Sequence, residues 1–106
     1  MATPRMTIPT QLVLQALIEA DEAYGAQLGA QTRLPSGTVH PILARLEGLD
    51  WVRSRWEDID PATEGRPARR YYRLTTEGRD QARAALARAA SQVRVSPSPR
   101  LVRRTL

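Results

Sequence analysis

Thr38, His40 and Arg45 stand on one face of a segment that repeats apolar residues at helical spacing. The apolar residues of this segment are Val39, Ile42, Leu43, Leu46 and Leu49. Because the three polar residues fall on the opposite face, they are exposed if the apolar stripe is buried. An arginine there can fork to a guanine edge or to a phosphate, and a threonine beside free helix N-terminal amides suits a phosphate oxygen. The face therefore offers the chemistry of duplex DNA recognition.

Less specific interpretations of these residues stay open. Arg45 could belong to a solvated helix face, and His40 could be a surface or capping histidine. A catalytic role for His40 is disfavoured because no second histidine, cysteine or evident orienting acid stands in the same turn region. The chain has no cysteine, which removes thiolate zinc sites and cysteine nucleophiles and fits a reducing cytoplasm. We therefore expect a protein that is not an enzyme, with no metal and no cofactor.

Arginines gather again in residues 66–73, around two tyrosines. Arg66 lies between a glycine and a proline, so we expect it at a turn from which its guanidinium enters the negative potential of a minor groove. A solvated turn residue is the alternative. Three further arginines flank the tyrosines on an alternating segment, namely Arg69, Arg70 and Arg73. At least one of these three should stack on a tyrosine or pair with Glu57 rather than touch DNA.

The charge of the chain is segregated along the sequence. All 16 basic residues are arginine, against 11 acids, for a formal net charge of +5. Residues 1–50 hold three arginines and five acids, whereas residues 51–106 hold 13 arginines and six acids. A high-GC coding bias would explain the missing lysine but not this segregation. The basic half therefore favours a nucleic acid or another anionic partner.

Membrane and export signals are absent from the pattern. The first residues lack the apolar run of a signal peptide, and no stretch approaches the roughly 20 apolar residues of a membrane span. We therefore expect a soluble, cytoplasmic protein with no membrane partner.

Two helices are predicted ahead of residues 36–46, which we call the recognition segment. Residues 11–20, opened by Pro9 and Thr10, form the first. Its predicted core stripe comprises Leu12, Val13, Ala16, Leu17 and Ala20. Leu14 and Ile18 point sideways from that stripe, so we expect this helix to need a second partner. A short helix over residues 24–31 follows, with Leu28 as its clearest core residue.

The recognition segment itself is expected to form a helix with defined ends. Ser36 or Thr38 is its predicted N-cap, because both side chains can accept a bond from a free amide. Asp50 is expected to end it in the left-handed conformation, which aspartate tolerates better than most residues.

Alternation then predicts two strands, at residues 51–57 and 69–75, joined by a long tip without periodicity. These strands carry Trp51, Trp56, Tyr71 and Tyr72. We expect the four rings to form the core of the hairpin, and a flat aromatic ligand site is the alternative. Thr76 caps a last helix over residues 77–93. Its narrow apolar seam comprises Ala82, Leu86, Ala89 and Val93.

This order of elements is that of a winged helix-turn-helix. Three stretches add a family resemblance, namely PSGTVHPILARLE at 35–47, WVRSRWE at 51–57, and GRPARRYYRLT at 65–75 with EGR at 77–79. Together they resemble the PadR family of transcriptional regulators, over about residues 12–86. Two positions depart from the usual pattern, since members usually carry tyrosine where His40 stands and glycine where Asp50 stands.

The resemblance implies a homodimer that binds an inverted-repeat operator, most often as a repressor and sometimes released by a small molecule. We predict these DNA-binding residues: Ser36, Thr38, His40, Arg45, Arg66, Arg69 and Arg70. We predict these dimerisation residues: Leu14, Ile18, Leu86, Ala89 and Val93. The expected partners are double-stranded DNA and a second copy of the chain, and a small aromatic effector is left open.

The expected fold class is mainly α with a small β-hairpin. An N-terminal arm (1–8) precedes the winged helix-turn-helix domain (9–76), and a dimerisation helix (77–95) and a disordered basic tail (96–106) follow. The alternative function is a winged-helix protein-interaction module that has lost DNA binding.

Overall fold

The computed structural model describes residues 3–95, except for the side chains of residues 93–95. Its helices are α1 (Ile8–Ala20), α2 (Gly25–Thr32), α3 (Ser36–Gly48), α4 (Pro61–Glu64) and α5 (Thr76–Val95). Its strands are β1 (Ala23–Tyr24), β2 (Val52–Trp56) and β3 (Arg70–Leu74). The predicted basic tail, residues 96–106, lies outside the described residues.

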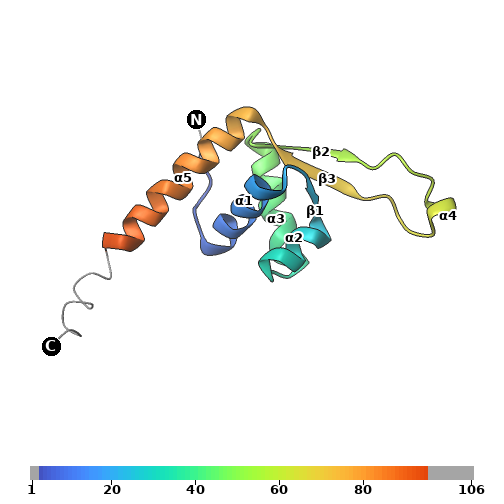
Figure 1. The fold of residues 1–106 in the computed structure, drawn as a ribbon, viewed down its shortest axis with the longest axis horizontal. Helices are drawn as coiled ribbons and strands as arrows, with labels where there is room; N and C mark the ends of the chain where they lie inside the picture. Colours follow the sequence, from blue (N-terminus) through green and yellow to red (C-terminus); the bar gives the residue numbers. More distant parts are fainter. Residues whose placement is uncertain (1–2, 96–106) are drawn as a thin grey trace.

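The architecture is a winged helix, as predicted. α1, α2 and α3 pack together, and β2 and β3 extend from them as a long arm that ends in α4 (Figure 1). The sheet has three antiparallel strands in the order β1-β3-β2, so β3 is central. The strand β1 and the single turn α4 were not predicted. Two residues are too few to show alternation, and one turn is too short for helical periodicity.

The first helix buries most of the predicted stripe, since Val13, Ala16 and Leu17 are in the core. Leu14 is also fully buried, whereas Leu12 is 41% exposed. α1 contacts α2 and α3, as well as β3 and α5, so this one chain covers both sides of the helix. The prediction that Leu14 points sideways without cover is therefore wrong.

The ends of α3 also differ in part. Pro35, not Ser36 or Thr38, is the N-cap residue, and its carbonyl accepts bonds from the amides of Thr38 and Val39 at 2.9 and 3.1 Å. No side chain caps this end, because Ser36 already lies within the helix. Asp50 follows α3 with φ of 62°, which confirms the predicted left-handed conformation.

Thr75 joins the start of α5 to the start of the wing. Its hydroxyl accepts a bond from the Gly78 amide at 2.8 Å and donates to the Asp50 carbonyl at 2.9 Å. Thr75, rather than the predicted Thr76, therefore caps α5. The first turn of α5 lies so close to Trp51 that a β-carbon added at Gly78 would stand 2.1 Å from the Trp51 carbonyl oxygen.

α5 is anchored by its first half and by Leu86, which is half-buried against the same core. Ala82 and Ala85 are buried in the core, and Arg79 donates to the Ile18 carbonyl at the end of α1 at 3.1 Å. The later turns project away from the three-helix body (Figure 1). Within the described part of the chain, no helix combines the length and apolar character needed to cross a membrane.

Candidate DNA-binding surface

The exposed face of α3 contains most of the polar residues predicted to lie there. Ser36, His40 and Arg45 are exposed, and Thr38 is half-buried. The middle of the same face is formed by exposed residues without polar side chains, namely Gly37, Pro41, Ala44 and Gly48. The opposite face buries Val39, Ile42, Leu43 and Leu46, as the apolar stripe predicted. α3 therefore presents a smooth ridge with polar groups along its two edges.

His40 lies against the first residue of α2. A β-carbon added at Gly25 would stand 2.8 Å from Cε1 of the imidazole. The ring is thus held at the junction of the two helices of the helix-turn-helix, while His40 as a whole stays exposed. The sequence pattern alone did not reveal this contact, because residues 25 and 40 belong to different helices.

Arg45 lies on the other edge of α3, towards the N-terminal segment. It lines an open hollow together with Arg5, Thr7 and Leu49. Two arginines therefore line one hollow beside α3.

Arg70 forms the edge of the surface on the side of the wing. Its guanidinium donates to the Ser54 hydroxyl at 3.0 and 2.8 Å and lies 3.6 Å from the carboxylate of Glu47 on α3. Ser54 in turn donates to Glu47 at 2.6 Å. This network fixes Arg70 next to α3, while its side chain stays 42% exposed.

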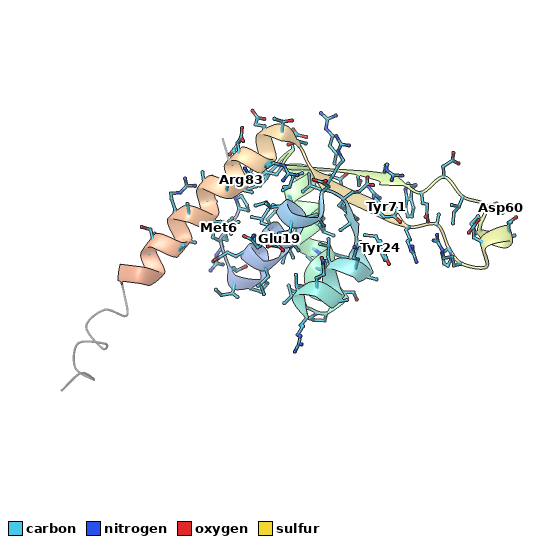
Figure 2. All side chains as sticks on the ribbon, viewed as in Figure 1. Met6, Glu19, Tyr24, Asp60, Tyr71 and Arg83 are labelled. Atoms are coloured by element: carbon cyan, nitrogen blue, oxygen red, sulfur yellow. The ribbon has the colours of Figure 1, made fainter. Side chains whose placement is uncertain are left out.

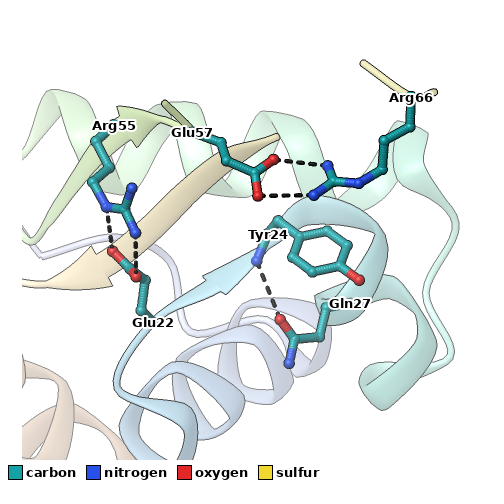
Figure 3. Close-up of polar contacts among 6 residues, drawn as sticks. All are labelled: Glu22, Tyr24, Gln27, Arg55, Glu57 and Arg66. Carbon is teal, nitrogen blue, oxygen red and sulfur yellow. Dashed lines mark hydrogen bonds and ion pairs between the residues drawn. The ribbon is translucent and has the colours of Figure 1, made fainter. Parts of the chain in front are cut away.

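Arg66 is engaged by the protein itself. Its guanidinium forms a two-pronged pair with the carboxylate of Glu57 at 2.7 and 3.0 Å (Figure 3). At least one of Arg69, Arg70 and Arg73 was predicted to stack on a tyrosine or to pair with Glu57, and of these Arg69 gives Glu57 only its backbone amide, at 3.1 Å. The stacking alternative is the one that the structure shows for Arg69. An Arg66 contact with a minor groove stays a prediction that requires this pair to open.

Arg66 holds the pKa of the Glu57 carboxyl at about 2, below its usual 4.5, mainly through its two hydrogen bonds. Because the folded pKa is lowered, the pair stabilises the wing above about pH 4.5, and this contribution is lost as the pH falls through about 2. An NMR titration of Glu57 should show this midpoint. Arg66→Gln should return it towards 4.5, whereas Arg55→Gln should raise the pKa of Glu22 instead.

The sheet face opposite α3 alternates cations with aromatic rings. Arg55 forms a two-pronged pair with Glu22 at 2.8 and 2.9 Å (Figure 3) and lies 4.9 Å from the centre of the Tyr71 ring. The rings of Tyr71 and Tyr24, both labelled in Figure 2, meet edge to face with their centres 5.5 Å apart. The Arg69 guanidinium lies 4.4 Å from the centre of the Tyr24 ring. Arg69 is therefore stacked in the fold, as one of the three arginines was predicted to be.

The four hairpin aromatics do not line one site within this chain. Trp51 and Tyr72 are buried, whereas Tyr71 lies on the outer sheet face. Trp56 is 63% exposed, so its prediction as part of the sheet core is wrong. It stands at the last residue of β2.

The predicted dimerisation residues divide into buried and accessible groups. Leu14 is fully buried within one chain and is not available to a partner. Ile18, Leu86 and Ala89 are half-buried, and the side chain of Val93 lies outside the described residues. Ile8, which was not predicted, is 63% exposed on α1.

Residues 13–84 match the PadR-like family of transcriptional regulators, and this match covers more than half of the chain. The chain belongs to that family. This match confirms the resemblance of the helix-entry and wing motifs to PadR regulators. No curated protein matches the sequence.

Solved structures share the fold of this PadR-like chain. A probable transcriptional regulator from Pseudomonas aeruginosa superposes with a TM-score of 0.72 at 23% identity, over 89% of this chain and 66% of its own. A PadR family transcription regulator from Clostridium difficile R20291 gives a TM-score of 0.66 at 23% identity, over 87% of this chain and 97% of its own. Reduced AbfR bound to DNA gives a TM-score of 0.64 at 29% identity, over 82% of this chain and 56% of its own. The PadR-like chain thus spans about two thirds of the Pseudomonas protein and just over half of AbfR.

Proposed function

We propose that this protein is a sequence-specific, cytoplasmic DNA-binding regulator that represses transcription from an inverted-repeat operator as a homodimer. The observation that carries the proposal is the exposed face of α3, bordered by Arg45 on one edge and Arg70 on the other. AbfR, which shares the fold at 29% identity, has been solved bound to DNA. DNA binding is therefore the function that this face fits best.

In this mechanism α3 enters the major groove with its smooth ridge facing the bases. Small residues at Gly37 and Ala44 allow the helix backbone to approach closely, while His40 and Arg45 reach base edges or flanking phosphates. Neutralised phosphates release counterions, so binding should weaken steeply as salt is raised.

Selection of bound sequences from a pool of random duplexes tests the proposal. We expect an inverted repeat whose half-sites are centred about one helical turn, roughly 10 base pairs, or a multiple of it apart. Recovery of no preferred sequence would overturn the proposal and favour a protein-interaction module instead. A small aromatic effector stays a prediction, and screening for release of the selected duplex would reveal one.

The homodimer is supported by the free end of α5. Ala82 and Ala85 face the body of the same chain, whereas Leu86 and Ala89 are only partly covered on the adjoining surface of the helix. A helix extending beyond its own domain gains little from propensity alone and is stabilised when another surface packs against it. A second copy, offering its own α5, would supply that surface.

Leu86→Glu should separate the two chains, because a carboxylate would be buried without a partner at the interface. Light scattering should fall from twice the mass of the chain to the mass of one, specific DNA binding should be lost, and most helical signal should persist. Ala84→Glu, on the exposed opposite face of α5, is the matched control and should stay dimeric. A wild-type protein that is monomeric at micromolar concentration would exclude the dimer.

A further inference from the structure

We propose that Trp56 is a DNA-contacting residue that works with Arg70, its indole packing on the deoxyribose edge of the duplex backbone while the guanidinium binds the neighbouring phosphate. This inference rests on the proposed function. It adds a residue of the wing stem to the surface formed by α3.

The exposure of Trp56 is unusual for its residue type. Its relative exposure is 63%, whereas that of Trp51, the other tryptophan, is 2%. Indoles are normally covered in a folded protein, because their large apolar surface contributes strongly when buried. An indole left open on an ordered strand therefore indicates a surface that a partner covers.

A chain of contacts connects Trp56 to the recognition helix. Glu47 on α3 accepts from Ser54, Ser54 accepts from Arg70, and the Arg70 guanidinium lies 5.5 Å from the centre of the Trp56 ring. The register pairs Trp56 with Arg70 across β2 and β3, on the sheet face that also carries buried Val52. Trp56 is thus on the same side of the sheet as α3, and a duplex docked on α3 would pass it.

Charge determines where on the wing that duplex makes contact. Residues 57–66, at the tip, carry four carboxylates against one arginine, a formal charge of −3, and that arginine is paired with Glu57. The tip, located by Asp60 in Figure 2, would be repelled by phosphates. On the stem, Arg70 lies on the face of Trp56 and α3, whereas Arg53, Arg55 and Arg73 lie on the opposite face and Arg69 stacks on Tyr24. DNA should therefore meet the stem at Arg70.

The open position of Trp56 favours a duplex over a small aromatic molecule. Because Trp56 is an exposed residue, its ring would hold a flat ligand from one side only. A duplex would instead be bound by α3 and Arg70, and these contacts would hold its backbone against the Trp56 ring. Trp56 would then add non-specific packing energy, since every nucleotide presents the same sugar.

Fluorescence quenching by acrylamide tests the proposal directly. Trp51→Phe leaves Trp56 as the only tryptophan, and Trp56→Phe leaves the buried Trp51 as the reference. The probe is the duplex enriched by the selection described above. We expect saturating duplex to lower the quenching of Trp56 towards that of Trp51, and to leave the Trp51 reference unchanged.

Binding measurements give a second, independent readout. Trp56→Ala should weaken binding to the selected and to random duplexes alike by about tenfold for each subunit bound, the effect of uncovering on the order of 50 Å² of apolar surface. Arg70→Ala should reduce the salt slope by about one for each subunit bound. Arg55→Ala, on the opposite sheet face, is the matched control and should leave the slope unchanged.

Each failure has a different meaning. If the selected duplex binds but does not protect Trp56, and Trp56→Ala binds with unchanged affinity, this inference alone is overturned. Absence of any bound duplex would overturn the proposed function and this inference with it. Protection of Trp56 without DNA, growing with protein concentration, would identify a second copy as the partner and would also overturn the inference.

Discussion

Gly78→Ala should unfold the protein or destabilise it by more than about 3 kcal/mol, a large share of the 5 to 15 kcal/mol typical of a domain. The new methyl group would stand 2.1 Å from the carbonyl oxygen of Trp51 and 2.6 Å from its α-carbon. Both are backbone atoms, so no side chain can rotate away. The wing start and the first turn of α5 would have to separate, and the Thr75 bonds between them would break.

Urea denaturation followed by circular dichroism measures this effect. Gly48→Ala is the control, because a β-carbon at Gly48 meets nothing within 4 Å. That substitution should be neutral or stabilise α3 by up to about 1 kcal/mol, since alanine favours a helix over glycine. Equal stability of the two variants would show that the contact between Gly78 and Trp51 is looser than the structure has it.

The second large effect concerns discrimination between DNA sequences. His40→Ala and Arg45→Ala should each weaken the selected operator by about 1 to 3 kcal/mol and random DNA much less, if the side chain reads a base edge. Preference would then collapse at one position in each half-site. Competition binding with operators changed one base pair at a time measures this.

Arg66→Ala is the contrasting variant, because its guanidinium is paired with Glu57 at the base of the acidic tip. It should weaken all duplexes by a similar, small factor. Equal losses on operator and random DNA for His40→Ala and Arg45→Ala would mean that α3 only positions the protein. Because His40 contacts Gly25, denaturation of His40→Ala must show an intact fold before its binding is interpreted.

Regular patterns in the sequence predicted the elements that position the surface. The apolar stripe of α3 lies in the core, and Asp50 adopts the left-handed conformation that was expected of it. These features are local, since spacing within one helix and the backbone preference of one residue decide them. The buried and exposed faces of α3 could therefore be assigned without knowledge of its neighbours.

Features that depend on contacts between elements were missed. α1 is apolar on several sides, so its sequence could not show that Leu14 is covered and Leu12 is not. Alternation predicted the strand that ends at Trp56, but not that this indole stays exposed. The partner of Glu57 depended on how α4 folds the tip back, which brings Arg66 to it across nine positions.

The register of the sheet also bears on how the protein avoids aggregation. β2 is an edge strand of the three-stranded sheet, and Arg53 pairs there with Arg73, like charge opposite like charge. Such a cross-strand pair opposes folding slightly. It also places charge along an edge whose free backbone groups could otherwise recruit the same strand of another molecule. We therefore expect Arg53, which lies on this edge strand, to oppose its pairing with the same strand of another molecule.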